Sequence, residues 1–291
     1  MKITSSRDVS LFELLLAEFK GASRSSVKRM IAHGNIMVNG ETVTNPTTLV
    51  KPDDHIEYQK YRMPSNTQGT PFPILYEDDH LLFVDKPAGI LTYGERGTIG
   101  TSLYKMLLDF LRQRSKGREK IFVVHRLDKE VSGIVLFAKS EEVQQKTKEN
   151  WKETEKLYYA LVEGKPKDKE GTLSNWLKET STQKMYITQQ SEDAKFAITH
   201  YKVLKEFPAH TLLEIRIETG RKNQIRVQLA GIGCPVTGDH KYSSQDPFKR
   251  QIRLHAFHFG FIHPVSGQPL KIETPLPKGF LRLDEKDEKY K

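Results

Sequence analysis

The sequence predicts a mixed α+β fold in which strands outnumber helices. From residue 72 onward, apolar segments with the alternation typical of strands recur along the chain and are separated by Gly, Pro and Asp turns. Amphipathic patterns with helical period are fewer. We therefore expect a mostly antiparallel central sheet with flanking helices, preceded by a small α+β unit at the N-terminus.

Composition narrows the class of protein. The 291 residues suffice for two domains, and 37% hydrophobic with 29% charged residues is typical of a globular chain. The net charge of +9 favours nucleic acid as a partner, although a basic balance can also serve solubility alone. The single cysteine, Cys234, excludes an intrachain disulfide and indicates a reducing compartment. No apolar run approaches the roughly 18 residues of a membrane span, so a cytoplasmic protein without a membrane partner is expected.

Residues 1–60 are expected to form the small unit. Leucines at helical spacing predict a first helix. A second, basic helix follows, and Asn39-Gly40 indicates a tight turn between two strands. The basic side chains of the second helix are Arg24, Lys28 and Arg29. By themselves they would make only a solvated face.

The remaining chain divides by composition. Residues 61–71 are poor in aliphatic side chains and rich in turn formers, which predicts a linker. Residues 72–283 form the larger domain, and the mixed-charge tail at 284–291 is expected to fray. A basic polar stretch from Arg112 to Lys120 is either a solvated loop or a surface along an RNA backbone, and both interpretations stay open.

The most distinctive polar segment lies between two apolar strand-like runs, residues 121–124 and 134–138. This short connection holds His125, Arg126, Asp128 and Ser132. Polar residues between two strands lie at the rim of a sheet. A structural Arg–Asp pair explains the pattern equally well, since such pairs are common.

A second polar cluster accompanies a turn that enters a helix, at residues 219–229. Arg221 and Arg226 lie near the start of this helix and would strengthen the attraction of a helix N-terminus for anions. Structural ion pairs with Asp or Glu are compatible with the same residues. Residues 238–242 are expected to form a loop.

Three histidines in the strand-like segment 254–263 raise a metal hypothesis. His255 and His258 would point to opposite faces of a strand, and no carboxylate accompanies them at the spacing of a ligand set. We therefore expect no metal site here, and packing or structural roles for these histidines.

Four separated blocks resemble, in order, the conserved blocks of the RluA family of RNA pseudouridine synthases. They are YEDDHLLFVDKPAGILT (76–92), VHRLDKEVSGIVLFAKS (124–140), EKLYYALVEG (155–164) and ETGRKNQIRVQLAGIGCPVTGDHKY (218–242). The segment LHAFHFGFIHPVSGQPLKIETPLP (254–277) is similar to the family's closing segment. The string H-R-L-D-x-x-x-S-G followed by L-F-A-K is the most specific part. The N-terminal unit resembles the small RNA-binding domain named after ribosomal protein S-four.

This resemblance implies the pseudouridine synthase fold and the isomerisation of uridine in RNA to pseudouridine. The N-glycosidic bond breaks, the uracil turns, and its carbon-5 joins ribose carbon-1, with no cofactor and no metal. Asp128 matches the catalytic aspartate, and Arg226 matches the arginine paired with its carboxylate. Tyr158 matches the tyrosine packed against the flipped base, and Arg126 matches the arginine that helps extrude the target. Attack on the ribose and removal of a proton both remain open for Asp128.

These implied roles agree with physical chemistry. A paired arginine would hold the carboxylate charged and oriented, and an aromatic platform would offset part of the few kcal/mol that base flipping costs. The chain departs from the family at Val131, where Thr is usual, and at Asn223 and Gln228, where His is usual. We expect these departures to affect helix packing and substrate choice without touching the catalytic positions.

The expected partner is RNA, and the expected state is a monomer. Large-subunit ribosomal RNA is the first choice and transfer RNA the second. Arg221 joins Arg126 as a substrate-binding residue, while the basic residues of the N-terminal helix contact phosphates. Two other functions compete: an RNA-binding protein that has lost catalysis, and a glycosylase that releases the free base.

Overall fold

The structure is a computed structural model that describes residues 2–4, 8–19, 23–32, 36–43, 45–58, 72–94, 102–245 and 251–282. The linker expected at 61–71 and the tail expected at 284–291 lie outside these residues. The chain divides into two compact units, Met1–Gln68 with Ile74–Tyr76 and Gly69–Pro73 with Glu77–Lys291. Within the described ranges, no helix is long and apolar enough to cross a membrane.

The first unit packs two helices on a small antiparallel sheet. Its elements are β1 (Lys2–Thr4), β2 (Val9–Ser10), α1 (Leu11–Glu18), α2 (Arg24–Ala32), β3 (Ile36–Val38), β4 (Glu41–Val43), β5 (Leu49–Val50) and β6 (His55–Tyr58). The sheet order is β1-β6-β3-β4, and β2 pairs with β5. Leu11, Leu15 and Ile31 join the helices in the core. Asn39 and Gly40 both have positive φ, which confirms the predicted tight turn between β3 and β4.

The second unit is built on a large sheet, whose strand order ends at β7, although Ile74–Tyr76 of that strand are grouped with the first unit. The elements are β7 (Ile74–Glu77), β8 (Leu81–Lys86), α3 (Leu103–Ser115), β9 (Phe122–Val123), β10 (Ser132–Ala138), α4 (Glu141–Glu149), β11 (Glu155–Glu163), β12 (Glu170–Glu179), β13 (Met185–Thr188), β14 (Lys195–Glu206), β15 (His210–Ile217), α5 (Gln224–Gly231), β16 (Leu254–Ile262) and β17 (Pro269–Glu273), with short 3₁₀ turns η1 (Trp151–Glu153) and η2 (His240–Tyr242). The sheet order is β13-β12-β14-β15-β11-β16-β10-β8-β7, with β17 on β16 and β9 on β10.

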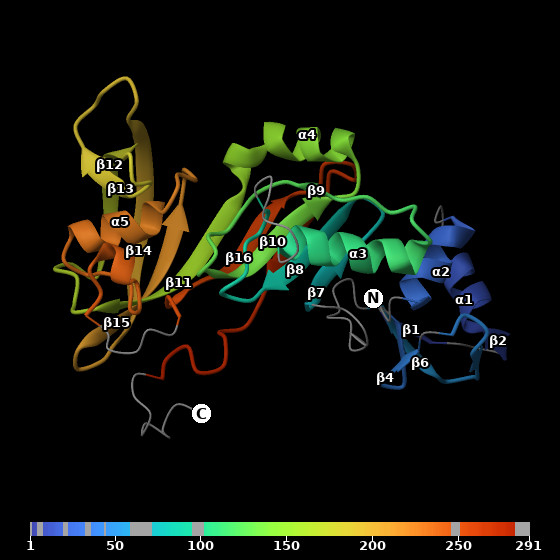
Figure 1. The fold of residues 1–291 in the computed structure, drawn as a ribbon. Helices are drawn as coiled ribbons and strands as arrows, with labels where there is room; N and C mark the ends of the chain where they lie inside the picture. The colour runs from blue at the N-terminus through green and yellow to red at the C-terminus, as the bar shows by residue number, and fades with distance from the viewer. Residues whose placement is uncertain are drawn as a thin grey trace. The chain divides into compact units, whose positions relative to one another are not determined.

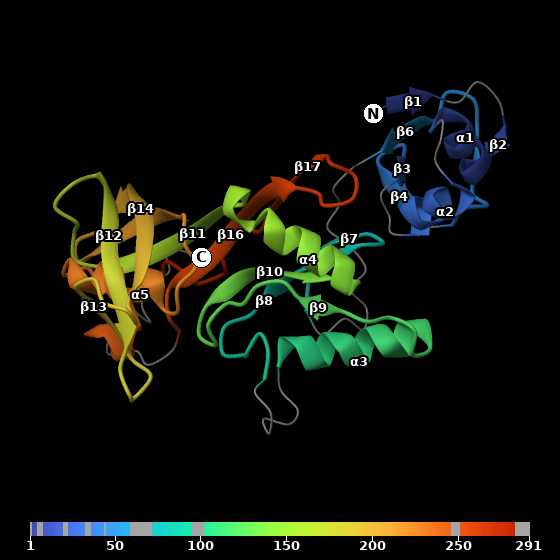
Figure 2. The same ribbon diagram turned by 90° about the horizontal axis from the view of Figure 1, so that it is seen from above.

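The sheet is mixed but mostly antiparallel, as predicted. Strands β10 and β16 run parallel, whereas β8, β9, β11, β12, β14 and β15 pair antiparallel with their neighbours. Helix α4 packs on β9 and β10, and α5 packs on β12, β13 and β14 (Figures 1 and 2). The strands β11 and β16 lie between these two halves of the sheet (Figure 1).

Gly133 allows β10 to approach β16 closely. Its φ is +116°, and a Cβ atom at this position would lie 2.2 Å from the carbonyl oxygen of Ala256. Only glycine adopts such a conformation without strain and leaves room for the facing backbone. The parallel pairing therefore depends on this residue, which is the second residue of β10, close to the end of the polar connection.

Two segments differ from the sequence-based prediction. Strand β12 spans ten residues where only a weak signal around 173–177 was expected, because most of its side chains are at least partly exposed and the apolar pattern is faint. The basic run beginning at Arg112 is not a loop throughout, since α3 extends to Ser115. Arg114 pairs with Glu77 and Glu119, so part of this run is a structural ion-pair cluster.

Candidate active site

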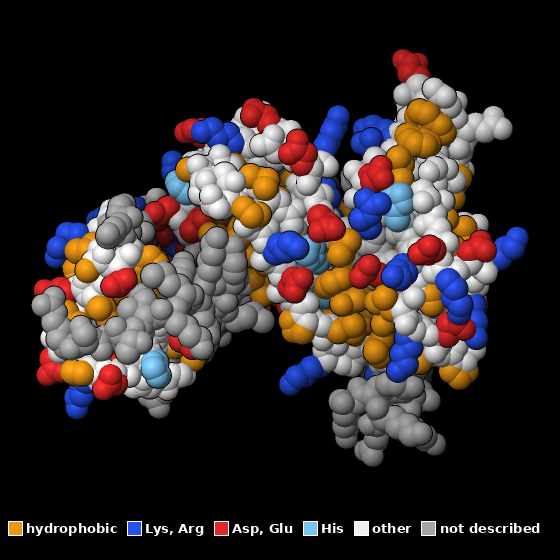
Figure 3. Space-filling view, turned by 180° about the vertical axis from the view of Figure 1, so that it is seen from behind, with side chains coloured by type: hydrophobic (Ala, Val, Ile, Leu, Met, Phe, Trp, Pro, Cys, Tyr) orange, Lys and Arg blue, Asp and Glu red, His pale blue; other side chains and the backbone are white. Residues whose placement is uncertain are grey.

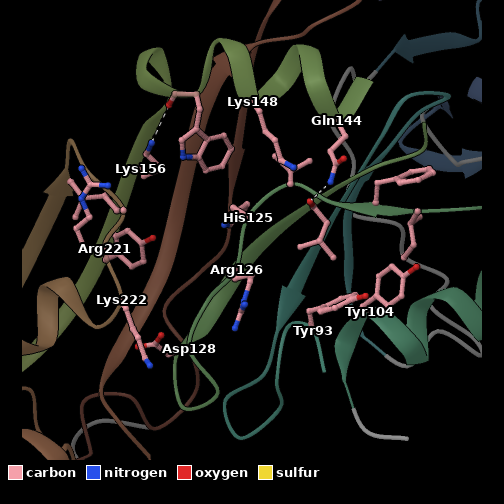
Figure 4. Close-up of a pocket in the computed structure, with 18 residues that line it drawn as sticks. Tyr93, Tyr104, His125, Arg126, Asp128, Gln144, Lys148, Lys156, Arg221 and Lys222 are labelled. Atoms are coloured by element: carbon pink, nitrogen blue, oxygen red, sulfur yellow. Dashed lines mark hydrogen bonds between the residues drawn. The ribbon is translucent and has the colours of Figure 1, made fainter. Parts of the chain in front are cut away.

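The connection between β9 and β10 forms the floor of a groove. Three adjoining cavities, of about 920, 440 and 110 Å³, are each lined by Arg126 and Asp128. Leu127, which lies between them, is buried and exchanges hydrogen bonds with Thr92: its N–H donates to the hydroxyl, and its carbonyl accepts from it. Its charged neighbours Arg126 and Asp128 both line the groove (Figure 4).

Two donors hold the carboxylate of Asp128. Arg226 Nη1 lies 3.0 Å from Asp128 Oδ2, and Asn223 Nδ2 donates to the same oxygen at 2.5 Å. The Asp128 side chain is 29% exposed, so it remains accessible from the groove. Charge-assisted hydrogen bonds of this kind are roughly twice as strong as neutral ones. The carboxylate is therefore both charge-balanced and oriented.

The amide of Asn223 is itself oriented by two donors. Its Oδ1 accepts hydrogen bonds from Tyr242 Oη at 3.0 Å and from Lys241 Nζ at 3.2 Å. This leaves the NH₂ group to face Asp128. Asn223 immediately precedes α5 with a left-handed φ of 50°, a conformation that Asn tolerates better than most residues. The expectation that Asn223 would not touch the catalytic positions is therefore wrong.

Arg226 is bound from its other side by Asp239. Its Nε and Nη2 donate to the two carboxylate oxygens of Asp239 at 2.6 and 2.8 Å, in a bidentate pair. The side chains of Arg226 and Asp239 are only 5% and 1% exposed. Burial opposes the charge of Arg226, but the hydrogen bonds and charges of Asp239 and Asp128 more than offset it and raise its pKa.

Asp239 was missed by the sequence reasoning, which expected only a loop at 238–242. The structure places residues 240–242 in the 3₁₀ turn η2, directly after Asp239. An acidic residue in a polar segment thirteen positions after Arg226 carries no periodic signal. Only the fold brings the two side chains together.

Tyr158 lies on β11 and lines the groove beside Asp128. The pairing of β11 with β16 shifts register between Leu157 and Tyr158. Burial, followed by the negative charge of Asp128, raises the pKa of the Tyr158 phenol above its usual value. The ring therefore stays neutral and offers a flat surface next to the carboxylate.

His125 has a structural role in the floor of the groove. Its Nε2 accepts a hydrogen bond from the Leu136 N–H at 3.1 Å, and its ring stacks on Phe259 at 5.4 Å between centroids. Burial and the nearby charge of Lys156 lower the pKa of His125 to about 3. The imidazole is therefore neutral near pH 7 and anchors the connection to the sheet.

Lys86, at the end of β8, holds the connection by a hydrogen bond to its backbone. The sequence reasoning did not identify this residue. Its side chain is 0% exposed, and its Nζ donates to the carbonyls of Pro87, Ile90 and Lys129 at 3.0, 2.8 and 3.3 Å. Burial lowers its pKa to about 8, although the charges of Asp128 and two other carboxylates oppose this. A lysine that ends an apolar strand run was the available signal.

Arg221 and Arg226 do not form the shared anion site that the helix start suggested. Arg221 is exposed and its Nε donates to the Phe196 carbonyl at 3.0 Å, while Arg226 points to the two carboxylates. Arg221 nevertheless lines the groove. The interpretation of structural pairing, left open by the sequence, thus holds for Arg226.

The other sequence-predicted residues lie elsewhere. Arg24 and Lys28 are exposed on α2, with their charged ends 4.9 and 5.6 Å from the centre of the Phe12 ring. The side chain of Arg29 lies outside the described residues. Gln228 is buried and donates to Leu173 O and Asn175 Oδ1, both at 3.0 Å, which ties α5 to the sheet.

The three histidines of β16 and its end are separated in space. His255 bonds Ser132, His258 lies between Glu155 and Glu273, and His263 bonds Asp78. Within the described part of the chain, no group of three or more His, Cys, Asp or Glu side chains is arranged to hold a metal ion.

The groove is strongly cationic. The largest cavity is lined by the basic side chains Arg126, Lys148, Lys156, Arg221 and Lys222, whereas Asp128 is its one carboxylate among the described residues. Seen from behind the view of Figure 1, the described surface mixes basic, acidic and hydrophobic side chains (Figure 3). A cavity lined by five basic side chains is the electrostatic footprint of a protein that binds nucleic acid, and the carboxylate and tyrosine within it are groups that can take part in chemistry on the bound nucleotide.

Comparison with known proteins identifies the family. Residues 80–231 match the family described as RNA pseudouridylate synthase, and residues 11–56 match the S4 domain. The "Ribosomal large subunit pseudouridine synthase D" of Xanthomonas campestris is 34% identical over 295 residues, which cover 94% of this chain and 87% of that protein. An "Uncharacterized RNA pseudouridine synthase" of Aquifex aeolicus is 32% identical over 289 residues, 93% of this chain and 91% of that protein.

Solved structures show the same fold. The human protein "RNA Pseudouridylate Synthase Domain Containing 4" aligns with a TM-score of 0.61 at 24% identity over 71% of this chain and 89% of that one. "Human RNA Pseudouridylate Synthase Domain Containing 1" aligns with a TM-score of 0.58 at 25% identity over 72% and 85%. The chain belongs to the RluA-type RNA pseudouridine synthases. It is an isomerase with an N-terminal S4 RNA-binding domain.

Proposed function

We propose that this enzyme isomerises a uridine of large-subunit ribosomal RNA, with Asp128 as the catalytic residue. The observation that carries the catalytic assignment is the geometry of Asp128 in the groove. Arg226 and Asn223 both donate to Oδ2, and within the described residues no group donates to Oδ1. That second oxygen is therefore left for the substrate.

The reaction of the family fits this arrangement. The bond between N1 of uracil and ribose C1′ breaks, the base turns, and a bond forms between C5 and C1′. The proton leaves C5, and N1 gains one, so the composition of the nucleotide is unchanged. The oriented carboxylate acts either on the ribose carbon or on a ribose proton. Both routes use the carboxylate oxygen Oδ1, to which no group among the described residues donates.

The neighbouring side chains are assigned supporting roles. Tyr158 supplies a neutral flat surface against which the uracil can turn without a directional hydrogen bond. Arg126, exposed and next to Asp128 in all three cavities, enters the space that the extruded nucleotide leaves in the RNA. Arg221 contacts the RNA backbone at the rim.

The domain organisation belongs to the same proposal. Residues 1–60 bind RNA, residues 61–71 link them to the catalytic domain at 72–283, and the tail follows. Exposed Arg24 and Lys28 supply phosphate contacts on the S4 domain. The choice of large-subunit ribosomal RNA is supported by relatives that carry the name of a ribosomal large subunit pseudouridine synthase.

RNA labelled with tritium at uridine C5 tests the chemistry. Isomerisation releases tritium to water, a glycosylase releases free uracil, and a protein that only binds RNA releases neither. We expect Asp128→Asn to abolish tritium release while RNA affinity changes less than about tenfold, because the substitution removes the charge and keeps the shape. Asp109→Asn, an exposed carboxylate on α3, is the matched control and should retain turnover. Turnover in Asp128→Asn would disprove the assignment.

Mapping of pseudouridines tests the choice of RNA. In RNA from a strain that lacks this gene, at least one pseudouridine of large-subunit ribosomal RNA should be missing, and wild-type protein should restore it in vitro. Loss confined to transfer RNA would replace the ribosomal substrate by a transfer RNA and leave the chemistry intact.

A further inference from the structure

Lys156 is a buried cation in the groove that the catalytic roles above do not use. It lies on β11 two residues before Tyr158, and both side chains are buried and line the largest cavity. Residues two apart on a strand point to the same face of the sheet. Figure 4 shows Lys156 and Arg221 among the side chains that line this cavity.

The ammonium group of Lys156 lacks a counter-charge. The side chain is only 7% exposed, and its Nζ donates to the Trp151 carbonyl at 3.3 Å and lies 4.7 Å from the centre of the Trp151 ring. Among the residues that the structure describes, no carboxylate lies within 4.0 Å of it. A carbonyl and a ring face compensate only part of the cost of removing a cation from water.

The other basic groups that line the cavity differ from Lys156. Lys222 forms an ion pair with Glu179, and Arg221 bonds a backbone carbonyl at the exposed rim. Arg126 and Lys148 are exposed to solvent. Lys156 alone among these five is both buried and uncompensated within the described residues.

We infer that Lys156 and the neighbouring Trp151 form a phosphate subsite that holds a backbone phosphate of the RNA next to the flipped nucleotide. RNA carries one phosphate for each nucleotide, and an ammonium group binds phosphate as a compact point charge. Uracil is neutral and offers no such charge. The subsite would therefore bind the phosphate backbone of the substrate on the same face of β11 as Tyr158, which packs against the base.

Burial makes this subsite selective for an anion. Burial lowers the pKa of Lys156 to about 8, so the group carries its charge near pH 7 and gains most when an anion displaces the remaining water. The phosphate would supply the counter-charge that the protein omits. This inference rests on the proposed place of the target uridine beside Asp128.

Substitutions at position 156 test the subsite. The probe is the RNA that wild-type enzyme modifies in the tritium assay, bound at a series of salt concentrations. We expect Lys156→Met to weaken binding about tenfold at low salt and to reduce the slope of log affinity against log salt by about one. Lys156→Arg should keep most of the wild-type affinity at low salt and most of the wild-type salt slope. The weaker binding of Lys156→Met should appear in the tritium assay as a higher KM for the same RNA, and Lys156→Arg should raise KM less.

The matched control is Lys152→Met, which removes an exposed lysine four positions earlier and outside the cavity lining. In this variant the slope of log affinity against log salt should equal that of the wild-type protein within experimental error. Thermal unfolding without RNA separates a binding role from a structural one, because removal of an uncompensated buried charge should leave the melting temperature unchanged or raised. Lys156→Gln serves as the second variant if Lys156→Met does not fold.

Chemical replacement of single phosphates identifies the ligand atom. In an RNA series with one neutral methylphosphonate each, one position near the target uridine should weaken binding to wild-type protein and not weaken it further in Lys156→Met. An unchanged salt slope with a large loss of melting temperature, or the absence of such a coupled phosphate, would overturn the inference. A failure of the proposed function is distinct, since wild-type protein would then release no tritium.

Discussion

Two buried cations of this enzyme, Arg226 and Lys156, have nearly the same exposure and opposite electrostatic surroundings. Arg226 is 5% exposed and donates to two carboxylates, Asp239 and Asp128. Lys156 is 7% exposed and contacts a carbonyl and an indole ring. The pKa of the first is raised and that of the second is lowered to about 8.

The difference indicates two roles: Arg226 is paired with carboxylates of the protein itself, whereas Lys156 would be paired with a phosphate of the bound RNA. Arg226 is an internal part of a charge network whose outer member, Asp128, faces the groove. Its charge is needed whether or not RNA is bound. Within the described residues no carboxylate pairs with Lys156. Burial of its ammonium group therefore costs free energy in the free enzyme, and a bound RNA phosphate would offset that cost. Stability and RNA binding should therefore respond oppositely at the two positions.

The largest expected effect is on stability, at Arg226. Arg226→Met should lower the free energy of unfolding by about 3–5 kcal/mol, because Asp239, which is 1% exposed, is left as an unpaired buried charge. Urea unfolding followed by circular dichroism measures this loss. Lys156→Met should show no comparable loss. Equal losses in the two variants would remove the distinction between them.

A double variant sharpens this first prediction. Arg226→Met combined with Asp239→Leu removes both charges and should recover most of the lost stability, since a well-packed apolar pair often replaces a buried ion pair without penalty. Turnover should stay low, because Asp128 still lacks its cation. Stability that stayed as low as in the single variant would indicate a packing role for Arg226.

The second largest effect is expected on turnover, at Asn223. Asn223→Ala removes a hydrogen bond to a charged group, worth about 1.5–3 kcal/mol, so kcat should fall about 10- to 100-fold. RNA affinity should change by less than about twofold, because the amide contacts protein groups alone. Asn223→His, which restores an N–H donor, should recover part of the activity. A fall in affinity with unchanged kcat would assign Asn223 to substrate binding instead.

Deletion of residues 1–60 tests how much the exposed phosphate contacts of the S4 domain contribute to RNA binding, in comparison with the buried contact of Lys156. RNA affinity should fall about tenfold and its salt dependence should become shallower, because the basic residues of α2 are removed. The circular dichroism of the remaining sheet and turnover at saturating RNA should persist. Addition of Lys156→Met to the truncated protein should weaken binding again. Unchanged binding on deletion would exclude phosphate contacts by Arg24 and Lys28.

The smallest effect is a pH dependence of RNA affinity. As pH rises through about 8, the Lys156 ammonium loses its proton and its attraction for phosphate, so affinity should fall by at most about tenfold for each pH unit. Lys156→Met should lack this component between pH 7 and 9. His125, with a pKa of about 3, does not titrate in this window. Lys86 also has a pKa of about 8, but its contribution is common to both proteins and cancels in the comparison.

The sequence predicted the polar connection between β9 and β10 well because its signals are local. Apolar runs flank Asp128 and Arg126, and the resemblance of separated blocks supplied Tyr158 and Arg226 before their contacts were visible. The weak points were partners distant in the chain. Asp239, Asn223 and Lys86 reach the site only because η2, α5 and β8 pack around the connection. No periodic pattern encodes such long-range pairing.

The sequence by itself determined the α+β class, the basic charge and the order of the motifs, because composition, alternation and turn residues are properties of neighbouring residues. Only the tertiary structure decided which charges are compensated. It placed Asp239 and Asp128 around Arg226 and left Lys156 among Trp151, His125 and the groove. Burial and counter-charge depend on how segments distant in the chain pack. That packing gives Arg226 carboxylate partners and leaves Lys156 without one among the described residues.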